Sequence, residues 1–262
     1  MFACDLDRTL IAEDGVLHPR TLNAIGRVRA TGTRVLIVTG RMFRSARPYL
    51  EQAGIDDPVV CYQGAVVAEA GGRFLRHEPI PLDLAKETIA AVEAEDFQLN
   101  CYVDDQLYVA RVTAAARAYA DFQSLTINVV GDLDRWLDRP PTKLVAVGEP
   151  KALDRLEERM KAAFDARLYI SKSLPFFLEF ASPEVTKASG LAFLAEHLGF
   201  SKEGTVAFGD GENDVELLQW TAYGVAVANA HERVLAVADF VCPSVHEEGV
   251  AQVLEAFLDS RA

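Results

Sequence analysis

Short apolar runs that alternate with helical stretches constrain the fold of this chain more than any other feature. The runs occupy residues 1–4, 34–38, 58–62, 205–209 and 223–228. Uninterrupted Val, Ile, Ala and Phe runs of this length are typical of parallel strands that are buried on both faces. Helices are predicted between them at residues 20–31, 42–53, 187–198 and 213–220. Strands that alternate with helices in this way predict an α/β fold with a parallel sheet.

The middle of the chain follows a different pattern. Its predicted elements are a helix at 82–95, two alternating runs joined at Asp104-Asp105 as a hairpin, a helix near 113–122, a strand near 142–147, a helix at 150–163, and strands at 166–171 and 176–181. We therefore predict a Rossmann-like core formed by residues 1–80 and 184–262, with an α+β cap domain inserted at 81–183. A length of 262 residues suits two domains. The joints near 79–81 and 182–183 are short, which indicates hinges.

Charge and cysteine content limit the possible partners. The formal net charge of -13 argues against nucleic acid, which requires clustered Lys and Arg, and favours a small substrate at a local basic site. The four cysteines are far apart in the sequence and form no C-x-x-C pair, which indicates reduced thiols in a cytoplasmic protein. We recognise no signal peptide and no apolar run near the ~20 residues that span a bilayer. We expect a monomer.

Two acids directly follow the first apolar run. Asp5 and Asp7 are expected at the carboxyl end of a strand, where open α/β sheets bind ligands. Residues two apart in an extended segment point the same way, and two carboxylates held close together repel each other. A divalent cation such as Mg²⁺ would resolve that conflict. The alternative is a strand that simply ends in a polar loop.

Polar residues at the ends of other predicted strands extend this pattern. Thr39 and Gly40 follow the second run, where a hydroxyl and backbone amides form an anion site or, alternatively, an ordinary helix cap. Asp210 and Asp214, with Asn213, follow the fourth run, so that further acids reach the same sheet edge. Acids there are also common as helix caps. Lys187 lies in the first turn of a predicted helix, where a cation is unfavourable, and such local conflicts are expected at functional sites.

These pieces match one family in order, type and spacing. The segments "DLDRTL", "VTGR" and "GDGENDVELL", together with Lys187, resemble the four motifs of the haloacid dehalogenase-like superfamily of phosphohydrolases. The resemblance covers nearly the whole chain. The position of the insertion and the segment "LEFASPEVTKASGL" resemble the Cof-type branch, whose α/β cap occurs at the same place.

The resemblance implies a role for each matched residue. Asp5 would be the nucleophile that forms an aspartyl-phosphate, and Asp7 the general acid and then the general base. Mg²⁺ would be held by the Asp5 carboxylate, the Asp7 carbonyl and Asp210, with Asp214 orienting metal-bound waters from the second shell. The phosphoryl oxygens would be bound by the Leu6 amide, Thr39, the Gly40 amide, Asn213 and Lys187.

Three functions are compatible with these expectations. The leading one is a Mg²⁺-dependent phosphatase acting on a small phosphorylated metabolite, in particular a sugar phosphate, which the cap would enclose. The second is a phosphomutase or phosphotransferase on the same scaffold, and the third is a phospho-ligand sensor without catalysis. Proteins and nucleic acids are too large to be enclosed and are not expected as substrates.

The chain departs from the family pattern at two positions. Arg8 stands where the family usually has Gly; it would oppose acid catalysis by Asp7, grip a second anionic group of the substrate, or face solvent, and we favour the last. Gln63 replaces a frequent Asn, so an amide is kept. Arg41 follows Gly40 and is a further candidate to face the site, whereas Arg44 and Arg47 are expected on a solvated helix face.

Overall fold

The computed structural model describes residues 1–261 (for residue 122, the main chain only). The chain forms two compact units. Residues 1–75 and the residues from 186 onward make the first unit, and residues 76–185 make the second. Among the described helices, none combines the length and the apolar composition that a membrane crossing requires.

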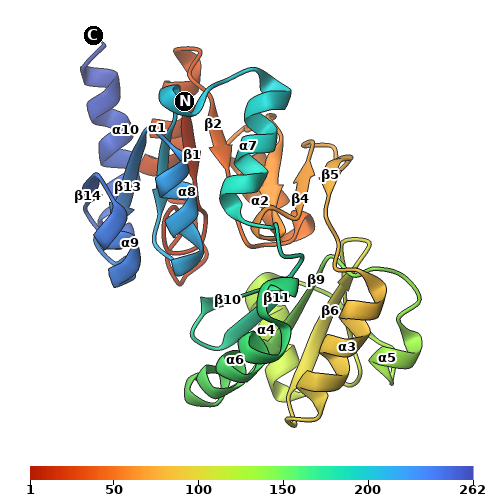
Figure 1. The fold of residues 1–262 in the computed structure, drawn as a ribbon. Coiled ribbons are helices and arrows are strands. Elements are labelled where there is room, and N and C mark those ends of the chain that lie inside the picture. Colours follow the sequence, from red (N-terminus) through yellow and green to blue (C-terminus); the bar gives the residue numbers. More distant parts are fainter. Residues whose placement is uncertain (262) are drawn as a thin grey trace. The chain divides into compact units, whose positions relative to one another are not determined.

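The first unit is built on a parallel sheet with the strand order β14-β13-β12-β1-β2. Strands β14, β13, β1 and β2 are labelled in Figure 1. Its strands are β1 (Phe2–Cys4), β2 (Val35–Ile37), β12 (Val206–Gly209), β13 (Tyr223–Val227) and β14 (Phe240–Cys242). Cys4 lies opposite Ile37 of β2 and Phe208 of β12. Because these three strands run in register, the residues that follow them meet at one edge of the sheet. The predicted α/β fold class is confirmed.

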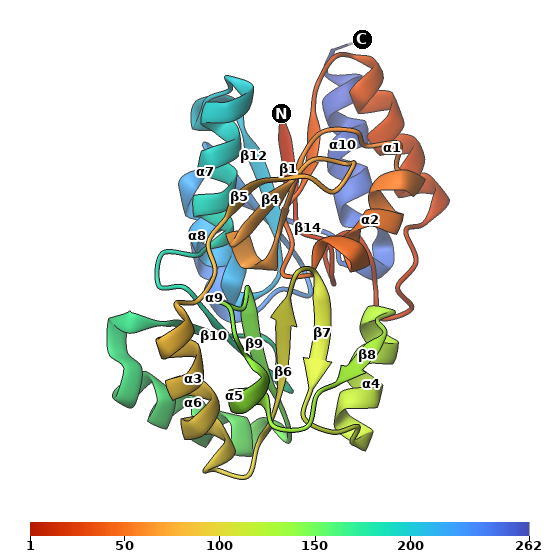
Figure 2. The same cartoon turned by 90° about the vertical axis from the view of Figure 1, so that its right-hand side faces the viewer.

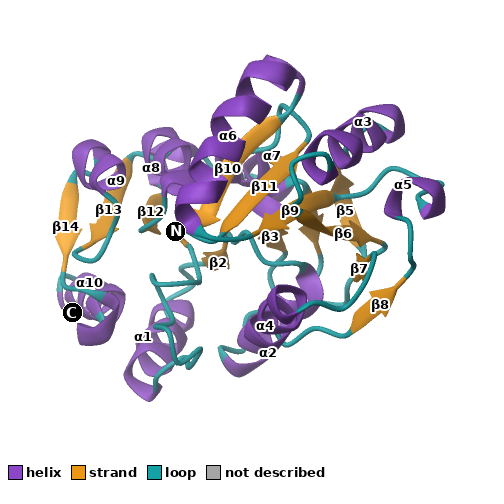
Figure 3. Cartoon of the chain, turned by 90° about the horizontal axis from the view of Figure 1, so that it is seen from below, coloured by secondary structure: helices purple, strands orange, loops and turns teal. Residues whose placement is uncertain are grey.

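Helices cover both faces of this sheet (Figure 3). They are α1 (Pro19–Ala30), α2 (Phe43–Gln52), α7 (Lys187–Leu198), α8 (Val215–Trp220), α9 (Glu232–Val237) and α10 (Gly249–Asp259). Ala3 of β1 belongs to a buried cluster with Leu191 of α7 and Leu217 of α8. Phe2, whose side chain points the opposite way, packs on Phe257 of α10 with ring centroids 5.0 Å apart. Both faces of β1 are therefore buried, as its unbroken apolar run predicts.

The apolar run at 58–62 was expected as another parallel strand, and this prediction is wrong in part. β3 (Val59–Cys61) pairs antiparallel with β4 (Val66–Ala68), and β5 (Phe74–His77) completes a separate small sheet. A single parallel bridge, Val38 to Val60, links β3 to the end of β2. The chain reverses at 62–64, where all three residues have left-handed φ angles.

Gly64 provides a test of this reversal. A methyl group at this position would lie 2.0 Å from the backbone oxygen of Thr186, and its φ of +107° disfavours any other residue. We expect Gly64→Ala to destabilise the protein by more than about 3 kcal/mol, because backbone at both places must shift. The matched control is Gly26→Ala in α1, where nothing lies within 4 Å and Ala favours the helix. Urea unfolding that gives equal stability for both variants would contradict this packing.

The second unit contains a mixed sheet with the strand order β10-β11-β9-β6-β7-β8. Strands β9, β6, β7 and β8 can be followed in Figure 2. Its strands are β6 (Gln98–Val103), β7 (Gln106–Val109), β8 (Ile127–Val129), β9 (Lys143–Val147), β10 (Tyr169–Leu174) and β11 (Phe177–Ala181). Neighbouring strands are antiparallel except for β7 and β8. The predicted hairpin is confirmed: β6 and β7 are joined by Asp104 and Asp105, both with positive φ, as tight hairpins require.

Both faces of this second sheet also carry helices. They are α3 (Leu82–Glu93), α4 (Ala114–Gln123), α5 (Leu133–Trp136) and α6 (Pro150–Phe164). Residues of α3, α5 and α6 share one buried cluster with Leu99 of β6 and Leu144 of β9. On the other face, Tyr119 of α4 packs edge-on against Phe177 of β11. The unit thus has its own hydrophobic core.

Candidate active site

The loop after β1 presents two acids and a threonine at the edge of the sheet. The Asp5 amide donates to the carbonyl of Phe208 (3.0 Å), which extends the pairing of β1 with β12 by one residue. The buried Leu6 anchors the loop, because its carbonyl accepts the amides of Leu10 (2.9 Å) and Ile11 (3.0 Å). Asp5 thus lies directly after the end of β1, and the turn at residues 6–11 fixes its position.

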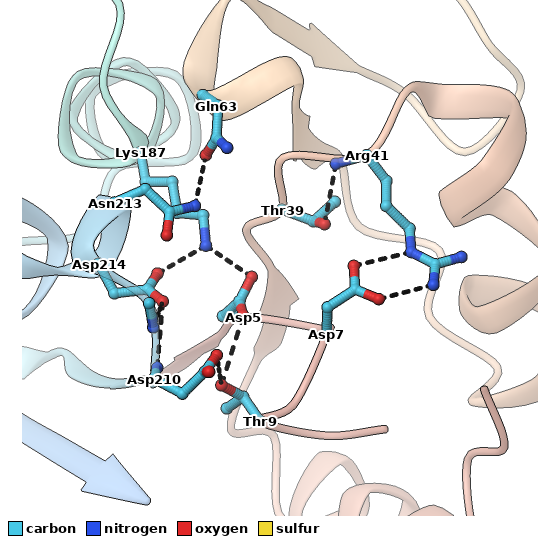
Figure 4. Close-up of polar contacts among 11 residues, drawn as sticks. Asp5, Asp7, Thr9, Thr39, Arg41, Gln63, Lys187, Asp210, Asn213 and Asp214 are labelled. Carbon is cyan, nitrogen blue, oxygen red and sulfur yellow. Dashed lines mark hydrogen bonds and ion pairs between the residues drawn. The ribbon is translucent and has the colours of Figure 1, made fainter. Parts of the chain in front are cut away.

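Lys187 enters the site from the first residue of α7. Thr186 caps this helix by accepting the Ser189 amide (3.0 Å), and the Ser189 hydroxyl accepts the Thr186 amide in return. The Lys187 ammonium lies 2.6 Å from Asp5 Oδ1 and 2.6 Å from Asp214 Oδ1 (Figure 4). Burial would lower the pKa of Lys187, but these carboxylates outweigh it and raise that pKa. Lys187 is therefore a fixed positive charge beside Asp5.

Asp210 and Asp214 complete the acidic group from the loop after β12. Asp214 Oδ2 accepts the backbone amides of Asp210 (3.1 Å) and Gly211 (3.0 Å), which folds the loop around this carboxylate. The Thr9 hydroxyl lies 3.3 Å from Asp5 Oδ2 and 3.2 Å from Asp210 Oδ1. Thr9, which the sequence offered only as part of the segment "DLDRTL", thus bridges the loop after β1 and the loop after β12.

The three carboxylates fit a hard divalent cation. Asp5, Asp210 and Asp214 each offer an oxygen, all within 4.8 Å of one another, and all three are buried. Burial, with the neighbouring acids, raises the pKa of Asp5 well above its usual range, although Lys187 opposes this. Burial likewise raises the pKa of Asp210 to about 7, and the charge of Asp214 adds to it. Carboxylates that are buried side by side repel one another, and Mg²⁺, which prefers such oxygen ligands, would offset that repulsion.

Asp7 lies outside this group of three carboxylates and pairs with a different cation. Arg41 holds Asp7 through two parallel bonds, Nε to Oδ2 (2.8 Å) and Nη2 to Oδ1 (2.6 Å) (Figure 4). β1 ends at Cys4, so the alternation of an extended strand no longer applies at residue 7. The two acids are thereby served by different cations, Lys187 and Arg41.

Arg41, which the sequence offered only as a further candidate to face the site, makes more contacts there than its rank suggested. Its side chain is almost fully buried, and Ser45 Oγ (3.3 Å) and Tyr49 OH (3.4 Å) accept from Nη1. Its backbone amide donates to Thr39 Oγ1 (3.1 Å), so Arg41 also connects the predicted phosphate loop to Asp7. In the sequence, the one sign that Arg41 lies in the site was its position directly after Gly40, which follows β2.

The remaining predicted residues lie together beside the acids. Asn213 Nδ2 donates to Gln63 Oε1 (2.8 Å), and Gln63 has a left-handed φ of 61°. Gly40 packs directly on that amide, because a Cβ at position 40 would lie 2.4 Å from Gln63 Nε2. The structure thus brings the segments after β1, β2 and β12 and the start of α7 to one place.

Comparison with known proteins agrees with this geometry. A family model described as haloacid dehalogenase-like hydrolase matches residues 2–254. The chain is 29% identical to 5-amino-6-(5-phospho-D-ribitylamino)uracil phosphatase YitU of Bacillus subtilis, over 98% of this chain and 97% of that protein. It is 26% identical to pyridoxal phosphate phosphatase YbhA of Escherichia coli, over 98% of each. The crystal structure of TM0651 from Thermotoga maritima superposes with a TM-score of 0.85 at 29% identity, covering 97% of this chain and 96% of that one.

Proposed function

Because the chain belongs to the haloacid dehalogenase-like hydrolase family and is a Cof-type phosphatase, we propose that it hydrolyses a small sugar phosphate with the help of Mg²⁺. We propose further that the reaction passes through an aspartyl-phosphate on Asp5. One observation carries this proposal most strongly. A fully buried Lys187 contacts the Asp5 carboxylate, while Asp210 and Asp214 come close enough to share a cation with it.

The first half-reaction forms the intermediate. An Asp5 oxygen attacks phosphorus, and the bond from phosphorus to the ester oxygen breaks as the new bond forms. Asp7 gives a proton to the leaving alkoxide. Lys187 balances charge as one anion approaches another, and the hydroxyl and amides after β2, with Asn213, orient the phosphoryl oxygens. Mg²⁺, held by the Asp5 carboxylate, the Asp7 carbonyl and Asp210, with Asp214 orienting its bound waters, would supply further positive charge to the phosphoryl group.

The second half-reaction releases phosphate. Asp7, having lost its proton, accepts one from a water molecule, whose oxygen attacks phosphorus and frees the Asp5 carboxylate. Arg41 positions Asp7 for both steps by binding both of its oxygens. One of these hydrogen bonds must be released before that oxygen can carry a proton to the leaving group, so we assign Arg41 the role of a positioning residue.

The proposed substrate class has two sources of support. The names of the two curated relatives specify a phosphoribityl compound and pyridoxal phosphate, which are both small phosphate monoesters. The net charge of -13 disfavours a polyanionic macromolecule. We propose the second unit, residues 76–185, as the cap that selects among such metabolites.

A phosphate-release screen with and without metal tests the function. We expect free phosphate from at least one sugar monophosphate in the presence of Mg²⁺, without any bisphosphate activator. Removal of divalent ions with EDTA is expected to lower the rate by more than about 10³-fold, because several kcal/mol of charge stabilisation are lost. Restored Mg²⁺ should recover the rate. Phosphoryl transfer to a sugar hydroxyl without net phosphate release would instead identify a mutase, and inactivity on the whole panel would refute catalysis of this class.

A further inference from the structure

Arg8 occupies a backbone position that normally suits glycine. Its φ of 59° is left-handed, which is unfavourable for a long side chain. The backbone is held there from both sides, since the Arg8 amide donates to the carbonyl of Ile11 (2.6 Å) and the Arg8 carbonyl accepts from Asn229 Nδ2 (2.9 Å). Asn229 is itself fixed, because its Oδ1 accepts the Val245 amide (2.8 Å). The Cα of Arg8, and with it the start of the side chain, is therefore set by the loop.

The guanidinium reaches the acidic group from this position. Arg8 Nη1 lies 3.8 Å from Asp210 Oδ2, and Arg8 Nε lies 3.9 Å from Oε1 of Glu13. The side chain of Asp210 is 7% exposed, whereas that of Arg8 is 39% exposed. Arg8 thus extends from solvent to a buried carboxylate, and the exposed Glu13 offers the guanidinium a second acidic partner.

Asp5, Asp210 and Asp214 are contacted by two different cations, Lys187 and Arg8. Lys187 contacts Asp5 and Asp214, and its charge acts on Asp210 through space. Thr9 serves Asp5 Oδ2 and Asp210 Oδ1 through a neutral hydroxyl. Arg8 is the cation that lies against the remaining oxygen, Asp210 Oδ2.

We propose that Arg8 is a built-in counter-cation for Asp210 that competes with the divalent metal ion and weakens its binding. The proposal rests on the proposed function, because it requires Asp210 to be a metal ligand. A metal ion that takes Asp210 as a ligand repels the guanidinium, which must move away toward Glu13 and solvent. The affinity for Mg²⁺ is then lower than that of the same loop without a cation at position 8.

Mg²⁺ titration of the 262-residue chain by isothermal calorimetry, without substrate, tests this competition. Arg8→Gln removes the charge and keeps a long polar side chain, and it should tighten the dissociation constant for Mg²⁺ by about tenfold, the effect of one nearby charge on a divalent ion in a water-like dielectric. Arg8→Gly should tighten it at least as much. Arg8→Lys keeps the charge and should remain within about twofold of the wild type.

Arg233→Gln is the matched control for net charge. Arg233 pairs with Glu212 on the surface (3.0 Å) and lies outside the proposed site. Its loss changes the net charge by the same amount and should shift the dissociation constant by less than about twofold.

Every other result counts against the proposal. An unchanged dissociation constant in Arg8→Gln overturns it, and so does tightening in Arg8→Gly alone, which would identify backbone strain as the cause. Equal tightening in Arg233→Gln would reduce the effect to net charge. Loss of Mg²⁺ binding in all variants and in the wild type would refute the metal site itself, whereas normal binding with no effect of position 8 refutes only the role of Arg8.

Discussion

Replacing Asp5 by Asn is expected to lower the rate of phosphate release by about 10⁴-fold or more. The variant keeps the shape of the side chain but removes the anion that attacks phosphorus. An amide can still accept from Thr9, but it cannot form an acyl phosphate. Burial and the neighbouring acids raise the pKa of Asp5, which means that the folded protein disfavours the charged form of this side chain. The neutral Asn should therefore leave the free energy of unfolding unchanged or increase it.

The comparison of activity with stability makes this test specific. The initial rate of phosphate release reports catalysis, and urea unfolding of the same sample reports folding. Asp5→Ala is a second control, because slow deamidation of Asn to Asp would restore activity in Asp5→Asn, whereas Ala cannot deamidate. A folded Asp5→Asn variant with a rate within about tenfold of the wild type would exclude Asp5 as the nucleophile.

Replacing Lys187 by Met is expected to affect both folding and catalysis. The side chain is 1% exposed and pairs with two carboxylates that are themselves buried. Met retains most of the volume but leaves these charges without their cation, and breaking a buried pair typically costs about 3–5 kcal/mol. The loss of a charge that stabilises the transition state should lower kcat by about 10²–10³-fold.

An exposed lysine provides the matched control for this second prediction. Lys161 pairs with Glu157 one turn away on α6 at 2.7 Å, and its side chain is 54% exposed. Lys161→Met should change the free energy of unfolding by less than about 1 kcal/mol, because exposed pairs contribute little. If both lysine variants were equally stable, Lys187 would not be the buried charge partner that the structure places between Asp5 and Asp214. Mg²⁺ should stabilise Lys187→Met more than it stabilises the wild type or Lys161→Met, because it replaces part of the missing positive charge.

Local signals explain why much of the fold could be predicted from the sequence. Helix α7 has the predicted bounds, 187–198, because Thr186 caps its start and Gly199 takes a left-handed φ of 70° at its end. The runs at 34–38 and 205–209 become parallel strands because both of their faces are covered. At these positions the local sequence and the tertiary environment favour the same structure.

The errors arise where a distant partner decides the structure. The run at 58–62 reads as a parallel strand, but its pairing depends on a reversal at 62–64 that apolar periodicity does not report. β14 was not predicted, and its residues Phe240 and Val241 are half exposed at the end of the sheet, so the apolar signal there is weak. A run of apolar residues indicates burial but not which strand lies beside it.

The site shows the same limit. Asp5, Lys187, Asp210 and Asp214 were named from motifs, and the structure places them in contact or within reach of one cation. Arg41 was underrated because its partner Asp7 lies 34 residues away in the sequence, and a lone Arg after a glycine carries no sign of that pairing. Which acid faces which cation is decided by the loop geometry after β1, where strand alternation has already ended.

Trapping the covalent intermediate tests the central claim most directly. The protein is mixed with a phosphorylated substrate and Mg²⁺, quenched during turnover, and treated with borohydride, which reduces an acyl phosphate to an alcohol. Mass spectrometry of the peptides should then find homoserine in place of Asp at position 5, and nowhere else, and only when substrate is present. An unmodified Asp5 during active turnover, or homoserine at Asp7, Asp210 or Asp214, would contradict the proposed mechanism.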